Sequence, residues 1–215
     1  MINSYKFRHF FVNKYIVKPL ARKTYFISYN YKYKTVWFRT YKVASHTINT
    51  HFKENTPDEQ DIYGSEVGYI PAFTDSFYKF AFVREPVDKY ISAWKNKVLQ
   101  QNYFQFPKRR YEQMKDIRNF ISYTENLDID NCNQHLRAQN SLIDLNNLNF
   151  LGRFENFNDD FKELCTAVGL PIKDMPIKNK SKVGHDIEVD EKSIERIRAI
   201  YEQDIRIFYP DLLNS

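Results

Sequence analysis

The sequence predicts an α/β fold with three layers, in which helices flank a central, mostly parallel sheet. The first observation behind this prediction is that segments with helical spacing of apolar residues alternate with short apolar, strand-like runs at 36–40, 77–83 and 148–152. The second is size: 215 residues with 42% apolar and 17% aromatic side chains can bury one core. We therefore expect a single domain over 1–215, with a basic, aromatic N-terminal segment (1–34) and a core (35–209).

The first two strands each lead into a helix. The run 36–40 is rich in β-formers, and 46–54 is expected to be helical. The run 77–83 is almost wholly apolar or aromatic, as expected for a strand covered on both faces. Pro86 suits the first turn of a helix, and apolar residues recur after it at helical spacing, which predicts a helix over 86–101.

A third strand and two further helices complete the pattern. The strand is expected at 148–152, and Asn158 is expected to cap the helix that follows it. Gly169 and Pro171 are expected to end that helix. Apolar residues at helical spacing predict a final helix over about 190–208.

Charge is distributed unevenly along the chain. Residues 1–53 hold eleven Lys or Arg and no Asp or Glu, although the net charge of the whole chain is only +5. Such a block attracts polyanions, and nucleic acid, anionic lipid and acidic polysaccharide all stay open. Peripheral contact of the N-terminal segment with a membrane is one of these options. The alternative is that these charges are merely solvated, beside buried tyrosines and phenylalanines.

The sequence does not indicate a metal site, a disulfide scaffold or a membrane span. Cys132 and Cys165 lack metal-ligand spacing, and the 5 histidines are scattered, so no metal is expected. No run reaches the roughly 18 apolar residues of a membrane span, and no apolar leader opens the chain. We therefore expect a cytoplasmic protein in a reducing compartment.

The residues after the first strand form the first candidate binding loop. Lys42 offers a point charge, and Ser45 and Thr47 offer hydroxyl groups beside the start of the expected helix, which suits a phosphate or a sulfate. The pattern GxxxxGK[ST] is absent, which disfavours an ATPase, a GTPase or a kinase that uses ATP. Taken alone, a solvated Lys42 at the head of a helix explains the pattern equally well.

The residues after the second strand form the second candidate loop. Arg84 follows the strand where the helix begins, so its guanidinium can hold a phosphate through two hydrogen bonds. Ser92, two helical turns later, can donate its hydroxyl to the same group. The alternative is a surface ion pair of Arg84 with Glu85 or Asp88.

Five segments, in order, resemble the carbohydrate sulfotransferases of the chondroitin and dermatan type (sulfotransferase family 2). Residues 80–97, FAFVREPVDKYISAWKNK, are similar to the family's 3′-phosphate motif F-V-R-[DE]-P followed by S-A-[YW]-x-[ND]-K. Residues 41–47, YKVASHT, resemble its 5′-phosphosulfate loop P-K-x-[GA]-[CST]-[TS], with Tyr41 in place of proline and His46 in place of a hydroxyl residue. Similarity to H-W-x-P-Q, to D-x-I-G-[KR]-x-E and to I-Y-x-x-D is found at 135–139, 149–161 and 200–208.

The resemblance implies a P-loop-like fold and transfer of a sulfuryl group from 3′-phosphoadenosine 5′-phosphosulfate (PAPS) to a carbohydrate hydroxyl, without a metal. Lys42 would neutralise charge on the leaving phosphate, while Arg84 and Ser92 would hold the 3′-phosphate. The 5′-phosphate would be bound by the loop residues Val43, Ala44, Ser45, His46 and Thr47. As in phosphoryl transfer, positioning and charge stabilisation would supply most of the acceleration.

The general base and the acceptor are less defined. His135 is the best base by residue type, because imidazole titrates near neutral pH. A structural role for His135 is the alternative, and His46 and Glu66 are other candidate bases. Glu155 is expected to be structural. An acidic or surface polysaccharide is the expected acceptor, because it suits the basic residues at 1–53 and 108–110, and no nucleic acid partner is expected.

Other functions remain as alternatives. A non-enzymatic module that binds polyanions or nucleic acid would use the basic segment and its tyrosines. An inactive sulfotransferase-like protein is another, because Tyr41 and His46 depart from the family's loop.

Overall fold

The computed structural model describes residues 10–56, 61–63, 66–172 and 189–213. The chain divides into two compact units: unit 1 comprises Met1–Thr40, Ala44–Val83 and Leu142–Pro176, and unit 2 comprises Tyr41–Val43, Arg84–Ser141 and Ile177–Ser215. A single domain over 1–215 stays a prediction.

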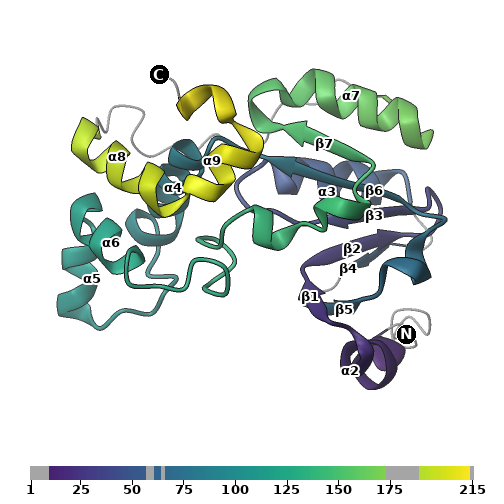
Figure 1. The fold of residues 1–215 in the computed structure, drawn as a ribbon, viewed down its shortest axis with the longest axis horizontal. Coiled ribbons are helices and arrows are strands. Elements are labelled where there is room, and N and C mark those ends of the chain that lie inside the picture. Colours follow the sequence, from purple (N-terminus) through teal and green to yellow (C-terminus); the bar gives the residue numbers. More distant parts are fainter. Residues whose placement is uncertain (1–9, 57–60, 64–65, 173–188, 214–215) are drawn as a thin grey trace. The chain divides into compact units, whose positions relative to one another are not determined.

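Unit 1 contains a five-stranded sheet with the order β4-β2-β3-β6-β7 (Figure 1). Its strands are β2 (Ile27–Asn30), β3 (Thr35–Phe38), β4 (Asp61–Tyr63), β6 (Tyr78–Val83) and β7 (Phe150–Arg153). β3, β6 and β7 are parallel, whereas β2 is antiparallel to both β3 and β4. The α/β class is confirmed, but the sheet is mixed and not mostly parallel. The physical reason is the four-residue link 31–34, which is long enough only to join antiparallel neighbours.

Two helices cover one face of this sheet. Phe80 stacks on Phe52 of α3 (Ser45–Glu54), with ring centroids 5.7 Å apart. Phe82 contacts Phe157 and Phe161 of α7 (Phe157–Val168). Because Phe80 and Phe82 lie two residues apart in β6, they point to the same face, and so α3 and α7 pack on that face. Gly152 of β7 lies against the ring of Phe82, where a Cβ would come within 2.3 Å of it.

A small second sheet packs on the opposite face. It consists of β1 (Lys23–Tyr25) and β5 (Val67–Tyr69), which are antiparallel. The ring of Phe38 lies 5.3 Å from that of Tyr25 and 5.2 Å from that of Tyr69. A layer of strands therefore covers this face where the three-layer prediction expected helices. Ahead of β1, residues 10–20 are helical and include η1 (Asn13–Val17) and α2 (Lys18–Leu20).

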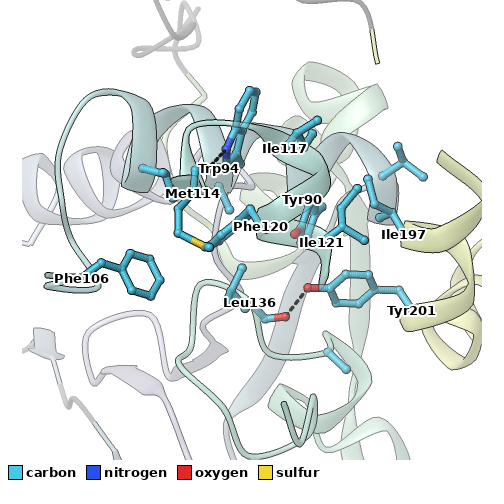
Figure 2. Close-up of a cluster of buried hydrophobic side chains, with 14 residues drawn as sticks. Tyr90, Trp94, Phe106, Met114, Ile117, Phe120, Ile121, Leu136, Ile197 and Tyr201 are labelled. Carbon is cyan, nitrogen blue, oxygen red and sulfur yellow. Dashed lines mark hydrogen bonds between the residues drawn. The ribbon is translucent and has the colours of Figure 1, made fainter. Parts of the chain in front are cut away.

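Unit 2 is helical. It comprises α4 (Pro86–Trp94), η3 (Lys95–Leu99), α5 (Lys108–Met114), α6 (Ile117–Thr124), α8 (Glu191–Ile200) and α9 (Glu202–Phe208). Its core contains Tyr90, Phe120, Leu136 and Tyr201, all almost completely buried (Figure 2). Trp94 also lies there, and its indole N–H donates to Met114 O at 3.0 Å. The shorter helical turns of the chain are η2 (Pro71–Thr74), η4 (Asn140–Leu142), η5 (Leu145–Asn147), η6 (Phe154–Asn156) and η7 (Pro210–Leu213).

Three predicted element ends need correction or confirmation. The helix expected over 86–101 is α4 continued by η3 to Leu99. The residue at the N-cap of α7 is Asn156, so Asn158 lies inside the first turn, whereas Gly169 ends the helix in the left-handed conformation (φ 69°) as expected. The helix expected over 190–208 is broken at Tyr201. Among the described residues, no helix has both the length and the apolar character that crossing a bilayer requires.

Candidate functional site

Residues of the two predicted binding loops contact each other in unit 2. Arg84 Nη1 donates to Lys42 O at 3.3 Å. Lys42 has a φ of 69°, a left-handed conformation that costs a non-glycine residue roughly 1–2 kcal/mol. Such a conformation persists only where the surroundings hold it. Arg84 is therefore part of what shapes the Lys42 loop.

The backbone of Arg84 is held by one buried side chain. Gln139 Oε1 accepts from Arg84 N at 2.9 Å, and Gln139 Nε2 donates to Arg84 O at 2.8 Å. Gln139 is held in turn by Asp204, whose carboxylate accepts from Gln139 N at 2.7 Å and from Asn140 N at 2.8 Å. Gln139 and Asp204 are both fully buried. Gln139 and Asp204, which come from two motifs far apart in the sequence, thus together position the backbone of Arg84.

Of the two ion pairs that the sequence left open for Arg84, the structure contains the one with Asp88. Its Nη2 lies 3.8 Å from the carboxylate of Asp88, at the outer limit of an ion pair, and the Asp88 side chain is 62% exposed. Glu85 caps α4 instead, because its carboxylate accepts from Val87 N and Asp88 N. An ion pair of this length with an exposed carboxylate adds little stability. The Arg84 side chain itself is only 17% exposed.

The loop that carries His135 is fastened by two buried side chains. Lys89 Nζ donates to Arg137 O at 2.8 Å and lies over the ring of Tyr201. The Tyr201 hydroxyl donates to Leu136 O at 2.6 Å. Burial lowers the pKa of Lys89 to about 8, an effect that Asp204 opposes. A fully buried lysine that binds a backbone carbonyl acts here as a positioning group for the His135 loop.

His135 is half-buried between two tyrosine rings. The ring of Tyr41 lies 4.7 Å and that of Tyr103 lies 4.9 Å from the imidazole, both edge-on. Its Nδ1 is buried and has no hydrogen-bond partner among the described residues. Burial and, to a smaller extent, the charges of Lys97, Lys42 and Lys89 together lower the pKa of His135 to about 3. The imidazole is therefore uncharged at neutral pH, and in the free protein it is a weaker base than an ordinary histidine.

Lys97 joins Lys42 and Arg84 in a group that we call the cation cluster. Burial lowers the pKa of Lys42 to about 8, with contributions from Lys97 and Arg84, and burial also lowers the pKa of Lys97. Lys97 Nζ lies 4.1 Å from the centre of the Tyr103 ring. Partly desolvated cations that repel one another gain stability when an anion binds among them. The cluster is thus suited to a multiply charged anion.

The rest of the first loop belongs to unit 1. Ala44 also has a left-handed φ, of 58°, and stands at the N-cap of α3, where no side chain caps the helix. Ser45 Oγ donates to Thr40 O at 3.0 Å, and the Thr40 hydroxyl donates to Phe82 O, so the turn is tied to β6. His46 is exposed and Thr47 is buried. A helix start that carries two left-handed residues just before it, without a capping side chain, offers backbone N–H groups to an anion.

The remaining candidates are more peripheral to these contacts. Ser92 is half-buried on α4, two turns after Arg84, and Val43 is fully buried. Glu66 accepts from the hydroxyl of Thr24 in unit 1 at 3.3 Å. Glu155 is exposed. A metal site is likewise not apparent, since the described part of the chain holds no group of three or more potential metal ligands.

Sequence reasoning missed three residues of this site. Lys97 and Tyr103 contact each other but come from the end of one helical segment and the loop after it, and Lys89 looks like an ordinary helix-surface lysine. The available signal for Lys97 was its place as the last residue of the 3′-phosphate motif. No local pattern indicated the burial of Lys89, because that depends on Tyr201 and Arg137.

Unit 1 has a helix start without a capping side chain, and unit 2 has a cation cluster and a neutral histidine. Each of these features, taken by itself, is suited to an anion. The sulfotransferase family model matches residues 24–210, and the chain belongs to this family. It is thus assigned to an enzyme family whose activity is sulfuryl transfer. Neither the curated proteins nor the solved structures gave a match.

Proposed function

We propose that the protein transfers the sulfuryl group of PAPS to a hydroxyl group of an acidic carbohydrate. The observation that carries this proposal is the cation cluster of Lys42, Arg84 and Lys97 beside an uncharged His135, in a member of the sulfotransferase family. Burial lowers the pKa of both lysines, and the charges of Lys97 and Arg84 lower that of Lys42 further below its ordinary value, so the protonated cluster is costly without a counter-charge. A donor with a 3′-phosphate and a 5′-phosphosulfate supplies that charge.

Each residue of the donor site would bind a different part of PAPS. Arg84, with its backbone held by Gln139, would bind the 3′-phosphate through its guanidinium, together with the hydroxyl of Ser92. Lys42 would lie against the 5′-phosphosulfate, and the backbone N–H groups at the start of α3, from Ser45 to Thr47, would bind the 5′-phosphate.

The chemistry then requires charge stabilisation and one proton acceptor. The acceptor oxygen forms a bond to sulfur while the bond from sulfur to the bridging oxygen of the 5′-phosphate breaks. Lys42 would stabilise the negative charge that develops on that leaving oxygen. His135 would take the proton of the acceptor hydroxyl, because its low pKa keeps the imidazole neutral before the donor binds. The negative charge of the bound donor would raise the pKa of His135 and so make it a stronger base.

An acidic acceptor is favoured by Lys97, the one member of the cation cluster to which no part of the donor is assigned. Lys97 lies over Tyr103, whose ring also contacts His135. A sugar hydroxyl placed at His135 would therefore bring its own acidic substituents near Lys97. The exposed Lys108, Arg109 and Arg110 extend positive charge along unit 2. Neutral sugars would gain nothing from these groups, so uronic acids or similar residues are the favoured acceptors.

Calorimetric titration with 3′-phosphoadenosine 5′-phosphate tests the donor site, with ADP as the ligand that lacks the 3′-phosphate. The wild type is compared with Lys42→Ala and Arg84→Ala, and with Lys192→Ala, an exposed lysine of α8, as the matched control. We expect Arg84→Ala to weaken binding by at least tenfold and to remove the preference over ADP, as loss of a charge-assisted contact should. Lys192→Ala should bind like the wild type.

Transfer is then measured with labelled PAPS on acidic and neutral oligosaccharides. Label on an acidic sugar, lost in Lys42→Ala and reduced at least a hundredfold in His135→Ala, would support the assignment. Equal binding of ADP would refute the donor site. Tight donor binding with transfer to another hydroxyl compound but to no sugar would refute the carbohydrate acceptor. Tight donor binding without transfer to any hydroxyl compound would identify an inactive relative.

A further inference from the structure

The helix at residues 10–20 presents a group of partly exposed apolar side chains. Six of its side chains are between 41% and 68% exposed: Phe10, Phe11, Val12, Tyr15, Ile16 and Leu20. Five of them form two neighbouring rows with a spacing of four residues, one of Phe11 and Tyr15 and one of Val12, Ile16 and Leu20. The rings of Phe11 and Tyr15 are in contact, with centroids 4.6 Å apart. The exposed residues thus make one continuous patch, which we call the apolar face.

The helix is anchored firmly by its opposite side. The Asn13 side chain donates to Gly68 O at 2.8 Å and accepts from Gly68 N at 3.0 Å. Gly68 lets the helix come close, because a Cβ at this position would lie 2.6 Å from Lys18 Cα. Asn13 is buried against β5 while the apolar face is exposed. The structure therefore holds this face outward and does not bury it in unit 1.

The charges on this helix and in the residues just after it are all positive. Lys14 and Lys18 lie one turn apart beside it and are exposed, and Arg22 and Lys23 follow at once. No Asp or Glu occurs in residues 1–53. A second copy of the chain would bring the same cations against these, so self-association through this face is opposed by charge. The complement of an apolar surface edged by lysines is a layer with anionic head groups above hydrocarbon.

We propose that the helix at 10–20 binds peripherally to bilayers that contain anionic lipid. Its apolar face would enter the boundary between head groups and acyl chains, where the ring of Tyr15 can keep its hydroxyl in the polar zone. Lys14 and Lys18 would reach the phosphates of the head groups. Attachment by one such helix is reversible. This inference does not depend on the sulfotransferase assignment, because it uses no residue of that site.

Vesicle flotation of the full chain tests the proposal. The vesicles are phosphatidylcholine alone or phosphatidylcholine with about a third phosphatidylglycerol, a fraction that gives a clear negative surface potential. The wild type should float with the anionic vesicles and, in raised salt, should lose most of this binding. Each lysine near an anionic surface contributes about fivefold to partitioning, so Lys14→Ser with Lys18→Ser should weaken binding about 25-fold. Phe11→Ser, Ile16→Ser and Leu20→Ser together should abolish it.

Matched variants of other surfaces serve as controls. Lys53→Ser with Lys192→Ser removes two exposed lysines, and Phe73→Ser with Ile207→Ser removes two exposed apolar side chains, without touching this helix. Both should bind like the wild type, and circular dichroism should show that every variant is folded. A Leu20→Trp variant gives an independent readout. Its emission should shift to shorter wavelength with anionic vesicles, because Trp37 and Trp94 are already buried and contribute a constant background.

Several results would overturn the proposal. Absence of flotation with anionic vesicles would do so, as would flotation that the triple serine variant retains or that the control pairs lose equally. A wild type that forms dimers in light scattering, with dimers lost in the triple serine variant and no vesicle binding, would make a second copy of the chain the partner of this face.

Discussion

The charge of Lys42 should destabilise the free protein, and replacing it with methionine should therefore increase stability. Methionine keeps an unbranched side chain of similar length but carries no charge. Burial, assisted by Lys97 and Arg84, lowers the pKa of Lys42 from 10.5 to about 8. This lowering of the pKa by about 2.5 corresponds to about 3.5 kcal/mol, at roughly 1.4 kcal/mol for each pKa unit. Because the side chain is only half-buried, solvent screening reduces the expected gain to about 1–2 kcal/mol.

The pH dependence has a definite sign. The pKa of Lys42 is lower in the folded state than in the unfolded chain. Below pH 8 both states carry the charge, and the charge then lowers the free energy of unfolding. Between pH 8 and 10.5 the folded state loses the proton first and the cost disappears. The advantage of Lys42→Met should therefore be full at pH 7 and largely absent near pH 10.5.

Urea unfolding at pH 7 and at pH 10 measures both effects. A gain of about 1 kcal/mol in a chain of this size should also raise the melting temperature by about 2–4 °C. Lys53→Met, at an exposed lysine of α3, is the matched control and should change neither value. With 3′-phosphoadenosine 5′-phosphate bound, the wild type should become more stable than Lys42→Met, because it gains a charge contact with the ligand that the variant lacks. The reasoning is refuted if Lys42→Met is no more stable than the wild type at pH 7, or equally favoured at both pH values.

Three further predictions follow from the same contacts. The value of kcat/KM for sulfuryl transfer should fall above about pH 8, because Lys42 loses its proton there. It should stay level down to about pH 5, because the pKa of His135 is lowered to about 3. A fall of kcat/KM below a pH near 6.5 would contradict this prediction. Gln139→Leu should lower the free energy of unfolding by about 3 kcal/mol in denaturant titration, since both hydrogen bonds to the Arg84 backbone are lost, and an unchanged midpoint would count against the positioning role. Ala44→Gly should raise the free energy of unfolding by up to about 1 kcal/mol, because glycine adopts a left-handed φ without strain, and a loss of stability in the same assay would show that the loop is not strained there.

Strands and helices with strong local patterns were predictable. The almost wholly apolar run at β6 and the helical spacing after Pro86 report burial residue by residue, and both elements were confirmed. Gly169 was recognised as a helix end because a left-handed residue there strongly favours glycine. These signals are local, so they survive without knowledge of the fold.

Pairings between distant short segments were not predictable. β1 and β2 lie in a stretch that the sequence presents only as basic and aromatic, and β1 pairs with β5 more than forty residues away. The break of the last helix at Tyr201 is similar, because its hydroxyl binds Leu136 O in a loop far away in the chain. A strand of three or four residues is too short to show a clear apolar periodicity, and the local sequence does not reveal which distant group a single side chain will contact.

The sequence by itself determined the family of this protein, the α/β class, and the identity of Lys42, Arg84 and His135 as candidates, because motif residues and apolar periodicity are written locally. Only the tertiary structure decided how unit 2 uses them. It buried Gln139 and Asp204 behind Arg84, and it placed Lys97 where its charge lowers the pKa of both Lys42 and His135. Desolvation and charge coupling depend on which groups lie within a few ångströms of one another, and that proximity exists only once the chain has folded.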